Sequence, residues 1–533
     1  MADRVHLYDT TLRDGAQTQG VDFGVADKRA IAEALDELGV DYVEGGWPGA
    51  NPTDDAFFAA PPRFRAARFA AFGMTRRAGR SAANDPGLSA VIGAGSPVVT
   101  LFGKTWDFHL REALGVDLVE GVDMIGGSIA EAVSRGREVI FDAEHFFDGY
   151  KANPSFARDC LAAARDAGAR WIVLCDTNGG TLPHEIERIV GELTALVPGD
   201  RLGIHCHNDT ENAVANSLAA VRAGARHVQG TLNGLGERCG NANLTSIIPN
   251  LVLKMGYVTG IDVRRLSRLT HVSRLLDDRL NRAPSRGAAY VGESAFAHKG
   301  GVHVSAVEKD PRTYEHVTPE SVGNRRNIVV SDQAGRANVL ARFRELGLDI
   351  AATDTRVQTL VDEVKRREHD GFAYDGAEAS FELLARRALG RVPEFFSLVS
   401  FRVITERRFD ARGELVTLSE ATVKLDARGQ RFLTVGEGNG PVNALDGALR
   451  AALGPMYPAL HDMRLVDYKV RILTPEDGTR AVTRVMIESA DRGGEAGSAR
   501  HWSTVGVSAN VIDASYNALL DAITWKLFKD GAG

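Results

Sequence analysis

The feature that most constrains the fold is an alternation between short β-rich apolar runs and longer stretches with helical spacing, which begins at Val5 and continues to about Gly256. Several helical stretches, such as Ala26–Leu38 and Glu211–Ala223, are followed by a glycine, as helix C-termini commonly are. Alternating strands and helices form a parallel sheet, and eight such units in roughly 250 residues are typical of a closed (β/α)₈ barrel. We therefore predict a TIM barrel rather than an open, doubly wound sheet. The eight predicted strands are Val5–Tyr8, Asp41–Glu44, Ala67–Phe72, Val98–Phe102, Glu138–Phe141, Trp171–Cys175, Leu202–His205 and His227–Leu232.

The pattern changes after residue 260, which divides the chain into three parts. Between 261 and 393 the sequence is helical and charged, so we expect linker subdomains there. From 394 to 533 β-rich segments return, and the segments that begin at Val435 and Val505 resemble each other. Such an internal repeat indicates a pseudo-symmetric α+β domain. The expected organisation is a barrel at 1–260, a helical linker region at 261–393 and a C-terminal α+β pseudo-repeat domain at 394–533.

Charge and cysteine content limit the partners and the compartment. The chain has 63 Lys and Arg against 70 Asp and Glu, a formal charge of -7, which gives no electrostatic reason to expect nucleic acid or an anionic membrane as a partner. Four cysteines in 533 residues cannot form a disulfide framework, which favours a reducing compartment. The sequence shows no apolar signal core and no run near the ~20 apolar residues of a membrane span. We expect a cytoplasmic protein whose partners are small molecules or other protein chains.

Polar residues collect at the C-terminal ends of the predicted strands, where the working groups of such barrels lie. Turns are polar in any fold, so one such residue carries little weight by itself. Two histidines, several carboxylates and an arginine at one rim favour an active site. The residues concerned are Asp9, Arg13, Asp14, Glu44, Glu144, Asp176, Thr177, His205, His207 and Asn233.

The segment IHCHND places His205 and His207 two residues apart on a predicted strand. Side chains two apart on a strand share a face, so both imidazoles would point into the barrel while Cys206 points outward into the helix layer. A lone strand histidine is usually a core residue, whereas a pair at a rim favours metal ligation. Asp14 would supply an oxygen ligand, because the barrel closes where strand one meets strand eight. Mixed nitrogen and oxygen ligands suit a catalytic divalent ion such as Mn²⁺, Mg²⁺, Co²⁺ or Zn²⁺.

Other rim residues leave two interpretations open. Arg13 has a planar fork that suits a bound carboxylate or a developing enolate oxygen, and a salt bridge within the rim is the alternative. Glu144, in FDAEHFFDG, is either an acid/base group of the rim or the residue that orders Arg13. The loop Gly234–Asn241, GLGERCGN, is weak evidence for phosphate binding, because no lysine and serine follow with P-loop spacing.

Three ordered motifs are LYDTTLRDGAQ, IHCHNDTENAVANSLAAVRAGA and GTLNGLGERCGNANL. With them the chain resembles, over nearly its whole length, the α-isopropylmalate synthase/homocitrate synthase/citramalate synthase family of DRE-TIM metallolyase type. The resemblance implies a metal-dependent (β/α)₈ barrel, a linker and a C-terminal allosteric regulatory domain that senses isoleucine or leucine. It also implies a Claisen-type condensation of acetyl-CoA with a 2-oxo acid, in which thioester hydrolysis releases CoA.

The same resemblance implies roles for individual residues. The metal ligands that it implies are Asp14, His205, His207 and Asn241. Arg13 would hold the 2-oxo acid and stabilise the enolate, while Glu144 and Thr177 match further active-site positions. The segment FAHKGG resembles one that supplies a catalytic histidine, here His298, to the barrel of the neighbouring subunit, which implies a homodimer. Tyr314 would be its companion. A structural linker role for His298 and a packed interface role for Tyr314 are the alternatives.

The identity of the 2-oxo acid is a finer question. The stretch from Phe72 to His109, with FAHKGGVHV, looks most like the branch that uses pyruvate, forms citramalate and feeds isoleucine synthesis. The acidic residue that usually follows the DG pair is Ala16 here, which could affect substrate preference. One alternative is 2-oxoisovalerate as substrate, which serves leucine biosynthesis. The other is a catalytically silent amino-acid-binding regulator, which is disfavoured because the predicted metal and catalytic residues are all present.

Overall fold

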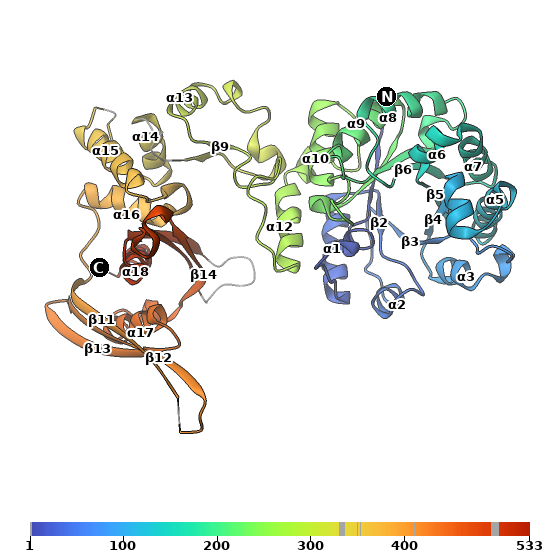
Figure 1. The fold of residues 1–533 in the computed structure, drawn as a ribbon. Helices are drawn as coiled ribbons and strands as arrows, with labels where there is room; N and C mark the ends of the chain where they lie inside the picture. The colour runs from blue at the N-terminus through green and yellow to red at the C-terminus, as the bar shows by residue number, and fades with distance from the viewer. Residues whose placement is uncertain are drawn as a thin grey trace. The chain divides into compact units, whose positions relative to one another are not determined.

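The computed structural model describes residues 3–329, 336–348, 350–351, 353–409, 411–491 and 500–532. These residues form two compact units, and Figure 1 labels many of their helices and strands. The first unit comprises the residues up to Phe296 together with His316–Arg326. The second comprises Ala297–Glu315 and the described residues from Asn327 onward.

The first unit is built around a closed barrel of eight parallel strands in the order β1 to β8, with β8 hydrogen-bonded to β1. The predicted TIM barrel is thereby confirmed, and the predicted strand ends agree with the observed ones to within three residues. The strands are β1 (His6–Asp9), β2 (Tyr42–Glu44), β3 (Arg68–Met74), β4 (Val98–Lys104), β5 (Glu138–Glu144), β6 (Trp171–Asp176), β7 (Leu202–Cys206) and β8 (His227–Gly230).

Helices lie between successive strands and cover the outside of the barrel (Figure 1). Helix α1 ends at Gly39, whose φ of 101° suits glycine, and an added Cβ there would lie 2.7 Å from the Gly260 carbonyl oxygen. The helices of this unit are α1 (Val25–Leu38), α2 (Pro52–Ala59), α3 (Pro86–Gly93), α4 (Asp107–His109), α5 (Leu118–Ser134), α6 (Phe146–Ala152), α7 (Pro154–Asp166), α8 (Pro183–Leu193), α9 (Ala213–Ala223), α10 (Leu244–Pro249), α11 (Val263–Leu266) and α12 (Leu269–Arg279).

Apolar side chains of the barrel pack in two separate layers. Trp171, Val173 and Cys175 belong to a cluster inside the barrel. Ile172 and Cys206 belong to the larger cluster between the strands and the helices. Successive residues of one strand therefore face opposite layers, as the period of two requires. The outward orientation predicted for Cys206 agrees with this packing.

The second unit contains a helical part and an α+β part, and the predicted pseudo-repeat is confirmed. Each repeat is a three-stranded antiparallel sheet followed by a helix. The helical part comprises α13 (Gly301–Lys309), α14 (Arg336–Glu345), α15 (Thr355–His369) and α16 (Glu378–Ala388), with the short parallel pair β9 (Ala297–His298) and β10 (Asn327–Ile328). The repeats are β11 (Ser397–Phe409), β12 (Leu415–Ala427), β13 (Gln430–Gly438) and α17 (Pro441–Leu453), then β14 (Met463–Ile472), β15 (Thr483–Asp491), β16 (His501–Ser508) and α18 (Val511–Lys529).

The two repeats differ in what covers their sheets. Val435 in β13 and Val505 in β16 occupy matching positions of the repeat. Val435 is 54% exposed, whereas Val505 is 1% exposed because it packs with Tyr374 and Phe381, which precede the repeats in the chain. Similar strand sequences therefore acquire different exposure from their tertiary neighbours.

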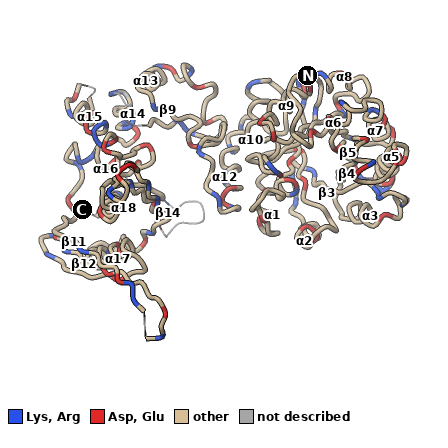
Figure 2. The backbone as a smooth tube through the Cα atoms, viewed as in Figure 1, with Lys and Arg blue, Asp and Glu red and all other residues tan. Residues whose placement is uncertain are grey.

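The positions of the charged residues and the state of the cysteines agree with what the composition led us to expect. Acidic and basic residues are interspersed along both units (Figure 2). All four cysteines are free thiols, of which only Cys239 is exposed. Among the described residues, no helix combines the length and the apolarity that crossing a bilayer requires.

Candidate active site

A pocket of about 190 Å³ lies at the C-terminal ends of the barrel strands. Six of the predicted site residues line it, namely Arg13, Asp14, Glu144, Thr177, His205 and His207. Asn241 adjoins the pocket, because its amide contacts Asp14 and His205. The polar strand ends thus converge on one rim. Asn233 is an exception, since its side chain bonds to helix α12 instead. Asp176 is another, since its carboxyl group accepts hydrogen bonds from Thr181 and does not line the pocket.

The tight turn after β1 holds Arg13 and Asp14 in place. The Thr10 carbonyl oxygen accepts hydrogen bonds from the backbone N–H groups of Arg13, at 3.2 Å, and of Asp14, at 2.9 Å. The buried Asp9 carboxylate accepts from the N–H and the hydroxyl of Thr11, at 2.9 and 2.8 Å. Because the turn satisfies its own polar groups, the side chains of Arg13 and Asp14 are left to line the pocket.

Arg13 is oriented by Glu44 and by an aromatic ring. Its Nε donates to Glu44 Oε2 at 2.7 Å, and its guanidinium carbon lies 3.7 Å from the centre of the Phe72 ring. Glu44 is fully buried and also accepts hydrogen bonds from the hydroxyls of Tyr8 and Thr10, each at 2.6 Å. Of the two interpretations of Glu144, the one in which it orders Arg13 does not hold, because Glu44, at the end of β2, forms this ion pair.

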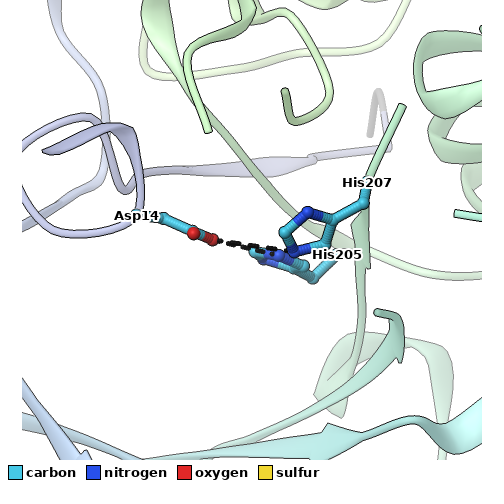
Figure 3. A group of neighbouring side chains, drawn as sticks. All are labelled: Asp14, His205 and His207. Atoms are coloured by element: carbon cyan, nitrogen blue, oxygen red, sulfur yellow. Dashed lines mark ion pairs between the residues drawn. The ribbon is translucent and has the colours of Figure 1, made fainter. Parts of the chain in front are cut away.

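Asp14, His205 and His207 form a cluster of candidate metal-ligand side chains, drawn in Figure 3. Asp14 Oδ2 lies 3.3 Å from His205 Nε2 and 4.0 Å from His207 Nε2. The three possible ligand atoms all lie within 4.8 Å of one another, and all three residues are buried. The carboxylate follows β1 and the imidazoles come from the end of β7, so the cluster depends on β8 bringing these two strands close.

Asn241 reaches this cluster because the Gly-rich loop turns back onto the end of β7. His207 and Asn241 form an isolated antiparallel bridge, and Asn241 Nδ2 donates to Asp14 Oδ2 at 2.6 Å. The turn requires a glycine at Gly240, where φ is 91° and an added Cβ would lie 2.0 Å from the Gly234 carbonyl oxygen. The loop GLGERCGN therefore delivers an amide to the Asp–His cluster.

The protonation states of Asp14 and His207 favour cation binding. Burial lowers the pKa of His207 to about 3, so its imidazole is neutral. Burial by itself would raise the pKa of Asp14, but the Arg13 guanidinium holds it well below its usual value, so this carboxyl is ionised. Asn241 Oδ1 is buried without a hydrogen-bond partner among the described residues. An anionic oxygen, imidazole nitrogens and an amide oxygen together fit a divalent cation.

Glu144 and Thr177 occupy neighbouring strand ends. Glu144 is the last residue of β5 and pairs in register with Lys104 of β4, whose Nζ lies 2.5 Å from Glu144 Oε2. Thr177 follows β6, and its hydroxyl accepts the backbone N–H of His145 at 2.9 Å. Since both side chains line the pocket, both can contact a bound molecule.

Sequence reasoning missed an aromatic wall of this pocket. The Trp47 ring packs edge-on against Phe72 and Phe102, with ring centres 5.7 and 5.6 Å apart, and the two phenylalanines stack at 5.2 Å. Apolar residues at strand ends look like ordinary core in a sequence, so only their position at the rim could have signalled a role. Further lining residues that were not predicted are Gln17, Asp142, Cys175, Glu237 and Arg238.

His298 and Tyr314 belong to the second unit. His298, in β9, is buried, and its Nε2 lies 3.3 Å from Glu315 Oε1. Tyr314 is 47% exposed, and the centre of its ring lies 4.3 Å from that of His303. The roles predicted for His298 and Tyr314 in the barrel site stay predictions.

Three family models match the chain in succession. They are HMGL-like at residues 4–273, homocitrate synthase post-HMGL domain-like at 290–371 and the LeuA allosteric (dimerisation) domain at 375–527. The (R)-citramalate synthase of Aquifex aeolicus is 50% identical over 532 residues, which cover 99% of each chain. The chain belongs to the (R)-citramalate synthase family.

Two further relatives show how similar the chain is to citramalate synthases and to an isopropylmalate synthase. The (R)-citramalate synthase of Geobacter sulfurreducens is 51% identical and covers 98% of each chain. The 2-isopropylmalate synthase of Rhodopseudomonas palustris (strain TIE-1) is 31% identical and covers 92% of this chain and 90% of its own. The predicted family is confirmed, and the similarity is greater to these two citramalate synthases than to the isopropylmalate synthase.

Proposed function

We propose that the protein is an (R)-citramalate synthase, which condenses acetyl-CoA with pyruvate and releases citramalate and CoA. The observation that carries this assignment is the pocket in which Arg13, Glu144 and the Asp14–His205–His207 cluster meet. The 50% identity to a full-length relative of that name supports the choice of substrate.

A divalent metal ion, Mn²⁺, Mg²⁺, Co²⁺ or Zn²⁺, is part of this proposal. The Asp14 carboxylate and the His205 and His207 imidazoles would hold it, because they are buried and mutually close. Asn241, whose buried Oδ1 has no hydrogen-bond partner among the described residues, would add an amide oxygen. When bound, such an ion supplies a Lewis acid for the carbonyl group of the 2-oxo acid.

Arg13 and its neighbours bind and orient the substrates. Nε of Arg13 is engaged by Glu44 and Nη1 also lies 3.5 Å from Asp14 Oδ2, so the remaining N–H donors of the two Nη groups are the ones that can face the pocket. They suit the pyruvate carboxylate or the oxygen of the acetyl enolate, since both carry negative charge. Thr177 also lines the pocket, and its hydroxyl can hydrogen-bond to a substrate oxygen.

The condensation needs a base, a carbon nucleophile and an electrophilic ketone. A base takes a proton from the acetyl methyl group, and the enolate carbon then bonds to the ketone carbon of pyruvate. The former ketone oxygen takes up a proton, and water cleaves the thioester to leave a carboxylate and free CoA. We assign the proton transfers to Glu144 together with His298 from a neighbouring subunit.

We further propose a cytoplasmic homodimer that supplies isoleucine synthesis and is inhibited by isoleucine or leucine. The match of residues 375–527 to the LeuA allosteric (dimerisation) domain supports both the dimer and the effector. In this arrangement His298 and Tyr314 of one subunit complete the barrel site of the other.

The substrate is tested with purified protein, Mn²⁺, acetyl-CoA and either pyruvate or 2-oxoisovalerate. Release of free CoA is followed by thiol absorbance, and the product is separated by chiral chromatography. We expect kcat/KM to be at least about tenfold higher for pyruvate, the range that one or two methyl groups give. Faster turnover of 2-oxoisovalerate would indicate an isopropylmalate synthase. No CoA release with either acid would indicate the silent regulator.

Delivery of His298 to the partner is tested with mixed dimers. Asp14→Asn and His298→Ala are each expected to be inactive alone. Co-expression gives heterodimers in which one of the two sites is intact, so about a quarter of the wild-type activity should return with random pairing of symmetric subunits. No recovery would show that His298 does not act on the partner's barrel.

A further inference from the structure

A chain of hydrogen bonds inside the barrel ends on His205. Gln229, in β8, is fully buried, and its Oε1 lies 2.8 Å from His205 Nδ1. Gln229 Nε2 donates to Asp142 Oδ1 at 2.9 Å, and Asp142, in β5, is 4% exposed. Strands β5 and β8 are not neighbours in the barrel, so this contact crosses its interior.

The chemistry of each group determines which atoms donate and which accept in this series of hydrogen bonds. An ionised carboxylate only accepts hydrogen bonds, so Asp142 faces the NH₂ group of the Gln229 amide. The amide oxygen also only accepts, and it therefore requires a hydrogen on Nδ1 of His205. A neutral imidazole carries only one hydrogen, so in the neutral His205 that a cation would bind, Nε2 keeps its lone pair. Nε2 is the atom that lies 3.3 Å from Asp14 Oδ2.

The location of these groups argues against a purely packing role. Burying an acid and an amide in a barrel interior costs desolvation that apolar side chains would avoid. The interior cluster of the barrel includes apolar side chains such as Val173 and Ile140. In addition, His207 Nδ1 has no hydrogen-bond partner among the described residues. These hydrogen bonds therefore orient His205 and not His207.

We propose that Gln229 and Asp142 are positioning residues of the metal site, a role that rests on the proposed function. They fix His205 as the Nδ1–H tautomer and thereby aim its Nε2 lone pair at the cation. Both act through His205 rather than by holding the cation themselves.

The first test disrupts the hydrogen bonds that connect Asp142, Gln229 and His205. Gln229→Leu deletes both hydrogen bonds, and Asp142→Asn keeps the shape but lets residue 142 donate, which allows the Gln229 amide to turn over. Each change should weaken Co²⁺ binding to the metal-free protein by about 10- to 100-fold, as loss of a ligand-orienting group does. Binding is followed by the visible absorbance of Co²⁺ above pH 7, because burial raises the pKa of Asp142 to about 7.

The second test exchanges the donor and the acceptor. In the double variant Asp142→Asn/Gln229→Glu, the new carboxylate accepts from His205 Nδ1 on one side and from the residue-142 amide on the other. The net charge stays that of the wild type, and the same tautomer is selected. Co²⁺ affinity should therefore return to within a few-fold of the wild type, which a packing role would not predict.

Glu138→Gln is the matched control. Glu138 begins the same strand as Asp142, pairs with Arg68 and accepts a hydrogen bond from Tyr42 at the far end of the barrel. This carboxyl-to-amide change should leave Co²⁺ affinity unaltered. Thermal unfolding of every metal-free variant shows whether the chain is folded.

The outcomes separate this inference from the proposed function. The positioning role alone would be overturned if Asp142→Asn bound Co²⁺ as tightly as the wild type. It would also be overturned if the double variant bound Co²⁺ no more tightly than Asp142→Asn. A wild-type chain that binds no divalent cation would overturn both the role and the proposed metal dependence. Should Gln229→Leu fail to fold, Asp142→Asn and the double variant decide the question by themselves.

Discussion

The two ends of the barrel both contain buried histidines, but their surroundings differ. At the C-terminal rim, His205 and His207 face the Asp14 carboxylate and a pocket. At the opposite end, His227 begins β8 with no exposed surface, and neither of its ring nitrogens has a hydrogen-bond partner among the described residues. The His227 ring packs instead against Trp171, with ring centres 4.9 Å apart.

This difference shows that the groups around a buried imidazole, rather than its burial, determine whether it can offer a ligand atom to a cation. Burial lowers the pKa of both His207 and His227. Asp14 adds a negative charge beside His207, and together they offer ligand atoms to a cation. His6 and Arg170 near His227 disfavour its protonation further, so that residue behaves as an aromatic side chain of the core.

The largest expected effect comes from removing a rim imidazole. His207→Ala should lower citramalate formation by at least about 10³-fold, the size of losing a main electrostatic stabiliser of the reaction. Mn²⁺ binding should be lost as well, whereas the metal-free chain should stay folded. CoA release and Mn²⁺ titration measure the first two effects, and thermal unfolding measures the third.

The same experiment on His227 is the control for that change. His227→Phe keeps an aromatic ring in the core cluster and should leave both turnover and Mn²⁺ binding as in the wild type. Undiminished turnover in His207→Ala would refute the metal proposal, and a loss of Mn²⁺ binding in His227→Phe would refute the contrast between the two ends.

A smaller effect is expected from Arg13→Lys. An ammonium keeps the charge but cannot both pair with Glu44 and present a planar fork to the substrate. We expect kcat/KM for pyruvate to fall about 10²-fold, as removal of one oxyanion donor does, with little change in Mn²⁺ affinity. Steady-state kinetics and Mn²⁺ titration measure the two quantities.

Arg170→Lys tests whether any arginine of the barrel would respond in this way. Arg170 stacks on Trp171 at 4.0 Å, away from the rim pocket. Its substitution should leave kcat/KM unchanged. Equal losses in both variants would mean that Arg13 acts through the stability of the barrel rather than at the site.

The smallest expected effect is on stability at acid pH. His227 is neutral when folded because burial lowers its pKa well below 6.5, but it binds a proton below about pH 6.5 when unfolded. The unfolded state therefore binds more protons, and stability falls as the pH falls. Between pH 6.5 and 5 this costs about 2 kcal/mol for one group.

His227→Phe removes that proton linkage. The variant should lose about 2 kcal/mol less than the wild type over the same pH interval, as measured by urea unfolding followed through tryptophan fluorescence. The exposed His184 serves as the control, since His184→Phe should leave the pH dependence of the wild type unaltered. An identical pH dependence in His227→Phe and the wild type would contradict the assignment of His227 as neutral.

Parts of the site could be predicted because they depend on local spacing. The interval of two between His205 and His207 places both rings on one face of β7 in any strand. Closure of the barrel between β1 and β8 then brings Asp14 near them, as observed. The role of these residues as metal ligands stays a prediction.

Other parts could not be predicted because they depend on contacts across the barrel. Glu44 rather than Glu144 pairs with Arg13, although both carboxylates are the last residues of barrel strands, β2 and β5. Gln229 and Asp142 meet from strands that are not adjacent, so no sequence interval relates them. Phe72 lines the pocket although its sequence environment is that of a core residue.

The sequence by itself determined the order of strands and helices, the fold class and the set of polar strand ends, because these follow from periodicities of two and 3.6 residues along the chain. It also determined the repeat, because the segments that begin at Val435 and Val505 resemble each other. Tertiary structure alone decided which acid holds Arg13, which amide orients His205 and which histidine is left in a dry core. Those choices depend on strand register and on the distance between side chains that come from different strands. Nothing in the linear spacing encodes such distances until the barrel closes.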